Sequence, residues 1–150
     1  MKPPAAPIEH PALHQRVAES FERQGMMRHL QASILRVAPG EVELWLPYSD
    51  KVTQQQDGFH GGAMGALADI AAGYAGLTTA PEGMEVATAE YKINFLAGQR
   101  GGALRAIGRV IKSGKRLIVT QAEVLHVAGD GKITPCAVMQ QTLAVVPKNY

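Results

Sequence analysis

The chain has 150 residues, enough for one ordinary domain with a core of its own. Hydrophobic residues make up 46% and charged residues 19%, and a net charge of +2 with scattered basic residues argues against a nucleic-acid-binding surface. No apolar run reaches the roughly 20 residues of a membrane span without a charge, and the first residues lack the apolar core of a signal peptide. The single cysteine, Cys136, excludes an internal disulfide and favours a reducing, cytoplasmic location.

The N-terminal part of the chain is predicted to be an arm followed by a helix. Residues 1–11 hold four prolines and are expected to form a loose arm. Apolar residues then recur at nearly helical spacing over residues 12–27, namely Leu13, Val17, Phe21 (or Ala18) and Met26. This pattern predicts one amphipathic helix that ends near Gly25. We expect residues 1–29 to cover the fold or to form an interface, and residues 30–150 to form the main domain.

A β-hairpin is predicted next, with strands at residues 30–38 and 41–47 around Pro39-Gly40. The second strand alternates, with Val42, Leu44 and Leu46 on one face and Glu41, Glu43 and Trp45 on the other. Residues 48–59 form a loop that holds three consecutive glutamines, Gln54, Gln55 and Gln56. Any of the three amides could point inward.

The segment that begins at Gly61 is predicted to be a long, buried helix. Eleven of the sixteen residues from Gly61 to Gly76 are Gly or Ala, and the only charge among them is Asp69. Gly65 and Gly73 each cost roughly 1 kcal/mol relative to Ala in a helix interior, so close packing is expected to compensate. A helix that is apolar nearly all round belongs in a core.

Four strands are predicted after this helix. They cover residues 86–96, 103–112, 117–127 and 136–146, with turns between them that include the basic turn Ser113–Arg116. In the first of the four, Ala87, Ala89, Tyr91, Ile93 and Phe95 are expected to face the core, and Thr88, Glu90, Lys92 and Asn94 to face away. The order of elements predicts an α+β fold in which an antiparallel sheet wraps around one central helix.

Asp69 lies on the small-residue side of the predicted helix. A carboxylate there must be hydrogen-bonded or face a cleft, so the residues leave a structural and a functional role equally open. Gly61 and Gly62 leave backbone N–H groups free at the helix N-terminus, which suits an anion or a developing oxyanion. Asp69 is two and a half turns away from them, so a site that uses both requires the N-terminus of another helix. This points to a symmetric dimer.

The motifs resemble a known family. Gln-x-x-Asp-Gly-Phe-His-Gly-Gly (residues 54–62), followed by Ala-Leu-Ala-Asp with the Asp nine residues after the His, is similar to the hotdog-fold acyl-CoA thioesterases of the phenylacetate-pathway (PaaI) type. Residues 88–98 and 110–119 fit the same pattern, and the resemblance covers about residues 30–146. It implies a single-domain hotdog fold that pairs into a dimer with a continuous sheet, and into a homotetramer.

The resemblance also implies an activity, the hydrolysis of an acyl-CoA thioester without metal or cofactor. It makes Asp69 the nucleophile or general base, and the backbone N–H of Gly61, supported by Gly62, the group that polarises the thioester carbonyl. His60 is implied to orient the loop and to contact the substrate. No nucleic acid or membrane partner is expected.

Further site residues carry over from the same resemblance. Gln54 stands where the family often has Asn or Gln, and Gln55 is the alternative because the triple glutamine leaves the register open. Thr88 matches a hydroxyl near the attacking water. Candidates for substrate binding are Asn94 and the basic pair Lys115 and Arg116. The pair is a candidate for the coenzyme A phosphates, with a solvated turn as the equal alternative.

Two other functions stay open for this fold. Acyl-thioester dehydratases and hydratases use loops in which His precedes Pro-rich residues or Asn precedes Pro, and neither Asn94 nor Asn149 precedes a Pro. A non-catalytic acyl-CoA-binding module is the other alternative, and the carboxylate of Asp69 argues against it. The acyl group is not determined: Tyr74, Phe59, Met64 and Trp45 are candidates for its pocket, and Gly73 replaces a hydroxyl residue one turn after Asp69.

Overall fold

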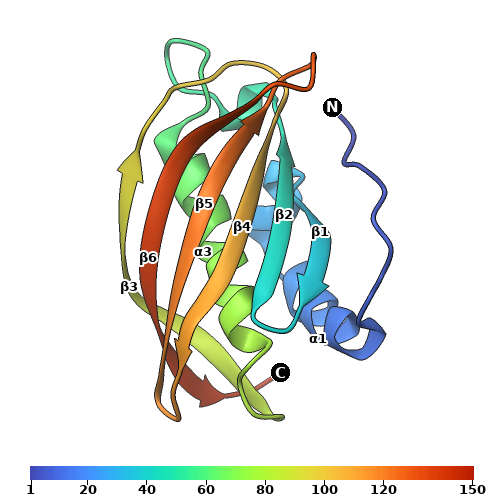
Figure 1. Cartoon of the computed structure of the whole chain (residues 1–150), viewed down its shortest axis with the longest axis vertical. Coiled ribbons are helices and arrows are strands. Elements are labelled where there is room, and N and C mark those ends of the chain that lie inside the picture. Colours follow the sequence, from blue (N-terminus) through green and yellow to red (C-terminus); the bar gives the residue numbers. More distant parts are fainter.

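The computed structural model describes residues 1–150 and shows one curved sheet wrapped around one long helix (Figure 1). The strands are β1 (Ser33–Ala38), β2 (Glu41–Pro47), β3 (Met84–Phe95), β4 (Ala103–Ser113), β5 (Leu117–Val127) and β6 (Ile133–Pro147). They lie in the order β1-β2-β4-β5-β6-β3, and each neighbouring pair is antiparallel. The helix α3 (Gly61–Leu77) lies against the concave face, after a short 3-10 turn, η1 (Asp50–Val52). The predicted α+β layout is therefore confirmed.

Small residues allow the strands to approach α3 closely. A Cβ atom at Gly108 of β4 would lie 2.3 Å from the carbonyl carbon of Ala71 in α3, and a Cβ at Gly76 would lie 2.3 Å from Leu143 Cδ1 of β6. Backbone atoms leave no room for a side chain at Gly108, and a side chain at Gly76 would require Leu143 to move. At Gly65, where close packing was expected, a Cβ would lie 3.4 Å from the Tyr91 hydroxyl, an ordinary contact. Gly73 differs, because nothing lies within 4 Å of a Cβ placed there. The small-residue side of α3 thus faces open space at this point.

The prediction of one N-terminal helix is wrong, because the segment forms two. α1 (Pro11–Glu22) and α2 (Gly25–Leu30) are separated at Gln24, whose extended backbone (φ −77°, ψ 104°) changes the direction of the chain. The change of direction also changes the buried face: Met27 is buried, whereas Met26 is 56% exposed. The buried residues Val17, Phe21, Met27 and Leu30 join the same hydrophobic core as α3 and the sheet. One core therefore joins the two N-terminal helices to α3 and the sheet.

A β-bulge in β3 overturns the predicted alternation of that strand before Glu90, whereas Tyr91 and Phe95 face α3 as predicted. Thr88 pairs with Leu143 of β6, but the next paired residue is Glu90, opposite Thr142, so Ala89 is an extra residue in the ladder. The extra residue restarts the alternation one position later, and Thr88 therefore faces α3 together with Tyr91. The expectation that Thr88 faces away from the core is wrong for this reason.

The proline-rich arm runs alongside β1 and reaches the outer face of the hairpin (Figure 1). Trp45, on the outer face of β2, is only 3% exposed, and its Nε1 donates a hydrogen bond to the carbonyl of Met1 (3.3 Å). Arg36 of β1 forms ion pairs with Glu9 of the arm (3.0 Å) and with Glu41 (2.5 Å). The arm is therefore tied to the hairpin by a polar contact at each end.

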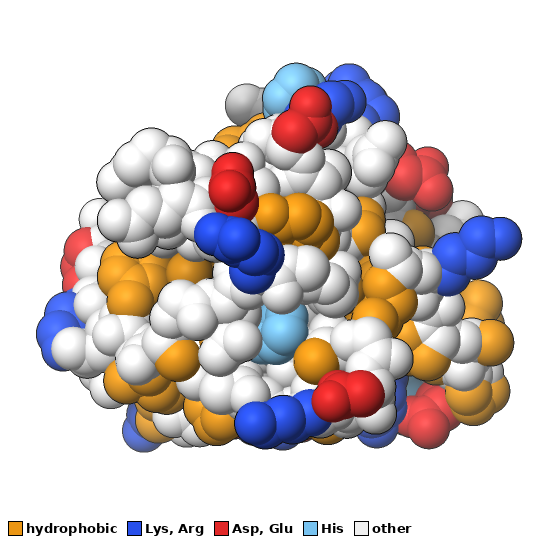
Figure 2. Space-filling view, turned by 90° about the horizontal axis from the view of Figure 1, so that it is seen from above, with side chains coloured by type: hydrophobic (Ala, Val, Ile, Leu, Met, Phe, Trp, Pro, Cys, Tyr) orange, Lys and Arg blue, Asp and Glu red, His pale blue; other side chains and the backbone are white.

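The end of the molecule at which α3 begins carries both acidic and basic side chains on its surface. Figure 2 shows this end of the molecule, where acidic and basic side chains are interspersed and hydrophobic side chains lie between them. No helix of the structure combines the length and the apolar character needed to cross a bilayer.

Candidate active site

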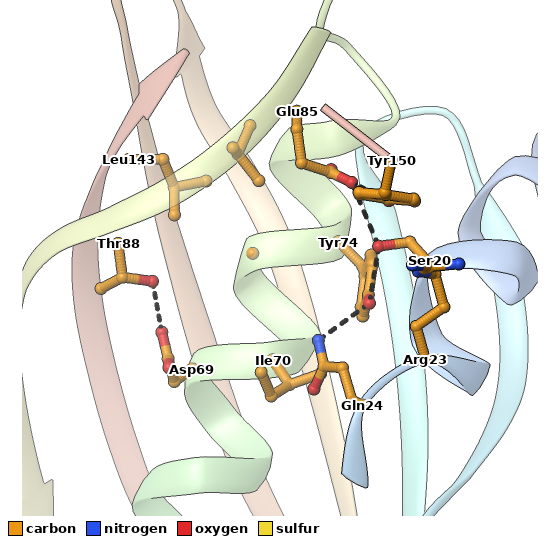
Figure 3. Close-up of a pocket in the computed structure, with 12 residues that line it drawn as sticks. Ser20, Arg23, Gln24, Asp69, Ile70, Tyr74, Glu85, Thr88, Leu143 and Tyr150 are labelled. Carbon is orange, nitrogen blue, oxygen red and sulfur yellow. Dashed lines mark hydrogen bonds between the residues drawn. The ribbon is translucent and has the colours of Figure 1, made fainter. Parts of the chain in front are cut away.

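A cavity of about 360 Å³ lies between α3, β3 and α1 (Figure 3). Asp69 of α3 and Thr88 of β3 line one side of it, and Ser20, Glu85 and Tyr150 line the other. An apolar cavity of roughly 150 Å³ is enough to hold benzene. The present cavity is therefore large enough for the body of a small organic acyl group next to the Asp69 carboxylate.

The carboxylate of Asp69 is held through one of its two oxygens. Thr88 Oγ1 donates a hydrogen bond to Oδ1 (2.7 Å; Figure 3), and Gln141 Nε2 donates to the same oxygen. Oδ2 makes no hydrogen bond. Every buried side-chain nitrogen and oxygen has a partner, and Asp69 is half-buried, so the unpaired Oδ2 is reached by solvent. One oxygen is thus anchored and the other is available for chemistry.

Gln141 is the residue of this site that sequence reasoning missed. It lies on β6 and is 0% exposed. Its Nε2 is 3.0 Å from Thr88 Oγ1 as well as bonded to Asp69, and its Oε1 accepts a hydrogen bond from the buried Thr120 (3.1 Å). The sequence does contain a signal for it. Residues two apart on a strand share a face, so Gln141 lies on the same face as Met139 and Leu143, and a polar side chain on a core-facing position needs a hydrogen-bond partner.

The N-terminus of α3 leaves one free backbone donor. Three of its first four N–H groups are paired: those of Ala63 and Met64 donate to the carbonyl of His60, and that of Gly62 donates to His60 Nδ1 (2.8 Å). Only the N–H of Gly61 has no partner. The His60 side chain therefore caps the helix, and of the two glycines proposed as oxyanion donors only Gly61 offers a free N–H.

The predicted glutamines lie in the loop before α3, at the same end as Gly61. Gln54 is half-buried and folds onto its own loop, where its Oε1 accepts from the N–H of Gln56. Gln55 and Gln56 are exposed. None of the three lines the cavity that holds Asp69. Gln54 is therefore the most buried of the three, but its amide bonds its own loop and does not reach Asp69.

The two halves of the predicted site are far apart within one subunit. Asp69 follows Gly61 by eight residues on one straight helix, which amounts to a rise of about 12 Å. A thioester carbonyl cannot contact both groups across that distance. Thr88, Gln141 and Asp69 form one half, and His60, Gly61 and Gln54 form the other.

The wall opposite Asp69 is a chain of hydrogen bonds. Gln24 Nε2 donates to the hydroxyl of Tyr74 (2.9 Å), which donates to Ser20 Oγ (3.1 Å), and Ser20 donates to Glu85 (3.2 Å; Figure 3). The hydroxyl of Tyr150 also donates to Glu85. Burial raises the pKa of Tyr74 to about 12, so this hydroxyl stays protonated at neutral pH. The N-terminal segment and Tyr150 thus close the far side of the cavity.

Of the four residues expected to shape the acyl pocket, only Tyr74 lines this cavity. Phe59 packs edge-on against Tyr48, and Met64 is in the core. Trp45 is on the outer face under the arm. Cys136 is buried in β6, and desolvation raises the pKa of its thiol, which does not favour a thiolate nucleophile.

The remaining substrate-binding candidates lie away from Asp69. Asn94 is exposed beside Lys92, which donates to its Oδ1, and it alternates with Ile93 and Phe95, so it points away from α3. Lys115 and Arg116 are exposed and form no ion pair, in the turn between β4 and β5 at the end of the molecule where α3 ends (Figure 1). No cluster of three or more His, Cys, Asp or Glu side chains is placed to hold a metal ion.

Comparison with known proteins agrees with this architecture. Residues 58–131 match the model of the Thioesterase superfamily. The chain is 30% identical to a candidate esterase of Saccharolobus solfataricus over 121 residues. This alignment covers 81% of this chain and 77% of the relative. A crystal structure of a thioesterase family protein from Silicibacter pomeroyi superposes with a TM-score of 0.87 at 35% identity, over 91% of this chain and 99% of the other.

The chain belongs to the thioesterase superfamily and has the hotdog fold of its members. The fold is also similar to that of the PaaI protein from the phenylacetic acid degradation operon of E. coli, with a TM-score of 0.77 at 20% identity, over 91% of this chain and 94% of that one. Membership of this superfamily supports a thioester-hydrolysing role.

Proposed function

We propose that this protein is an acyl-CoA thioesterase of the PaaI type, with an active site shared between two subunits. The observation that carries the proposal is the pair of unsatisfied groups: a carboxylate with one anchored and one free oxygen, and a single free N–H at a helix N-terminus. Thioester hydrolysis needs both kinds of group, a base or nucleophile and an oxyanion donor. Both kinds of group are present among the described residues, and the reaction needs no other.

In the general-base route, Asp69 Oδ2 takes a proton from water while the water oxygen bonds to the thioester carbon. The carbonyl electrons move onto its oxygen, which accepts a hydrogen bond from the Gly61 N–H of a second subunit. The intermediate then collapses, the carbon–sulfur bond breaks and the sulfur takes the proton that Asp69 Oδ2 removed from the water. In the nucleophilic route, Oδ2 itself bonds to the carbon and CoA leaves as the thiolate; water then cleaves the resulting anhydride, and a proton from that water converts the thiolate to the thiol. Both routes consume one water and yield an acid and CoA.

The free edge of β3 supports pairing with a second copy of the chain. β3 is a twelve-residue strand at the edge of the sheet, and its large side chains Tyr91 (43%) and Phe95 (52%) are strongly exposed. A long edge strand with exposed large side chains of this kind can pair with another strand. Pairing of two β3 strands would make one continuous sheet and a homodimer, and dimers of this kind would assemble into a homotetramer in a cytoplasmic setting.

The acyl group is proposed to occupy the cavity beside Asp69. Its walls combine apolar side chains, such as Ile70 and Leu143, with the hydrogen-bonded chain that ends at Tyr74. Ser20 and Gln24 contribute to this wall, so residues 1–29 act as part of the acyl site although the catalytic domain is assigned to residues 30–150. Placing Gly73 one turn after Asp69 leaves space for the substrate where a side chain would otherwise stand.

A coupled assay tests the proposal directly. The protein is incubated with a panel of phenylacetyl-type, hydroxybenzoyl and medium-chain CoA thioesters, together with a reagent that reports free thiols. Release of CoA at a rate proportional to protein concentration supports the thioesterase. Tight binding of acyl-CoA with no release of thiol identifies a non-catalytic binding module instead. If the protein neither binds nor hydrolyses any thioester in the panel, both functions are overturned.

We expect the turn between β4 and β5 to hold the CoA phosphates. Lys115 and Arg116 are exposed and free of acidic partners, so changing both to Ala should raise KM for acyl-CoA severalfold and weaken its dependence on salt, with kcat little altered. The matched control is Lys51→Ala with Lys132→Ala, which removes the same charge at exposed positions elsewhere. Equal KM values for the two double variants at low salt would mean that the basic turn is only solvated and does not bind the CoA phosphates.

A further inference from the structure

We infer that Gln141 is the positioning residue of this active site, and that it fixes Asp69 so that Oδ2 is the reacting oxygen. The inference rests on the proposed function for the reaction, and on the hydrogen bonds of Gln141 for the assignment. Gln141 is fully buried and is not itself one of the residues that line the cavity, so it acts on the substrate only through two residues that are, Asp69 and Thr88.

The chemistry of its neighbours fixes the orientation of the Gln141 amide. An ionised carboxylate only accepts hydrogen bonds, so the side of the amide that faces Asp69 must be the NH₂ group. The carbonyl Oε1 then faces Thr120, whose hydroxyl donates to it (3.1 Å). Both Gln141 and Thr120 are 0% exposed, so no water competes for these bonds. The orientation of the amide is therefore set from both sides.

Gln141 and Thr88 close a three-membered ring of hydrogen bonds with Asp69. Thr88 Oγ1 donates to Asp69 Oδ1 (2.7 Å), and Gln141 Nε2 contacts both Oδ1 and Thr88 Oγ1 (3.0 Å). The hydroxyl hydrogen of Thr88 is thus committed to the carboxylate, which makes Thr88 an orienting group rather than a donor to the attacking water. Rotation about the last bond of an Asp side chain is otherwise soft. Two donors on Oδ1 remove that freedom and leave Oδ2 for the substrate.

The test removes the amide while keeping the core packed. Gln141→Met alone leaves the Thr120 hydroxyl buried without a partner, a change that costs stability, so the main variant is Gln141→Met combined with Thr120→Val, which replaces both partners by apolar groups of similar shape. We expect kcat to fall roughly 10- to 100-fold, with KM little changed, because a loosely held catalytic group is misplaced without losing substrate contacts. The matched control is Gln140→Met, an exposed neighbour on the same strand, which should keep wild-type kcat.

A double-mutant cycle separates positioning from a structural role. If Gln141 acts through Asp69, adding Gln141→Met and Thr120→Val to Asp69→Asn should cost no further activity. The same fold loss in both backgrounds, or no loss in the wild-type background, would overturn the inference. A crystal structure of the double variant gives a readout independent of activity: we expect the Asp69 carboxylate to turn or to occupy several orientations. A single, unchanged orientation overturns the positioning role, whereas absence of CoA release by the wild-type protein overturns only the proposed function.

Discussion

Replacing Asp69 by Asn should lower kcat for acyl-CoA hydrolysis by roughly 10²- to 10⁴-fold, the usual range for loss of a general base. The change keeps the size of the side chain and leaves an oxygen that accepts from Thr88 and Gln141, so the local structure has what it needs to persist. It removes the charge of Oδ2, and with it the basicity and nucleophilicity on which both routes depend. KM should change little, because the proposed contacts to CoA, at Lys115 and Arg116, lie elsewhere.

Thermal unfolding distinguishes this result from a purely structural role. A structural Asp69 would give a variant whose Tm falls by several degrees, the shift that corresponds to about 1–2 kcal/mol, and whose folded fraction turns over normally. The control Asp50→Asn removes a carboxylate that is exposed and makes no side-chain hydrogen bond. A destabilised Asp69→Asn protein with nearly wild-type kcat would contradict the mechanism.

Replacing Gly61 by Pro should lower kcat by roughly 10²- to 10³-fold, the range found for loss of one oxyanion-hole donor. Proline removes the one free N–H of the helix start, and it does so at the first helical position, where proline is favoured. The preceding residue, His60, already has the extended backbone that a following proline requires (φ −69°, ψ 135°). The helix should therefore form normally without its donor.

The control for this variant is Gly61→Ala. A Cβ at position 61 would lie 3.2 Å from the ring of Phe95, which is 52% exposed and has room to move. Ala adds this Cβ but keeps the N–H, whereas Pro adds it and removes the N–H. We expect Ala to cost far less than Pro. Equal losses in kcat would mean that crowding against Phe95, rather than the missing donor, causes the effect.

Much of the fold could be predicted because its residues are locally consistent. Alternation in β2, the Gly- and Ala-rich run of α3 and the turns between strands each specify one kind of element. The break between α1 and α2 lies close to Gly25, where the first helix was expected to end, but the short helix α2 that follows was not predicted. The bulge at Ala89 could not be predicted, since it is defined by the pairing of β3 with a distant strand, β6. The bulge matters most, because it brings Thr88 to the face that holds Asp69.

The candidate site was predicted in part for the same reason. The motif gave Asp69 and Gly61, which lie on one helix and are joined by a fixed spacing. Gln141 follows Asp69 by 72 residues and reaches it only because β6 lies under α3, a contact that no local pattern encodes. The difference between Gly61 and Gly62 depends on the rotamer of His60, which caps one amide and leaves the other free.

Subunit complementation is the most direct measurement of the central claim, that Asp69 and Gly61 act together from different subunits. Asp69→Asn and Gly61→Pro subunits are co-expressed with different affinity tags, and oligomers that carry both tags are isolated. Each dimer made of one subunit of each kind contains one site with a wild-type Asp69 and a wild-type Gly61, and one site that lacks both. Symmetric pairing therefore predicts recovery of on the order of a quarter to a half of wild-type activity, depending on how many dimers of the oligomer are mixed. Mixed oligomers as inactive as the two parent variants would contradict the shared site.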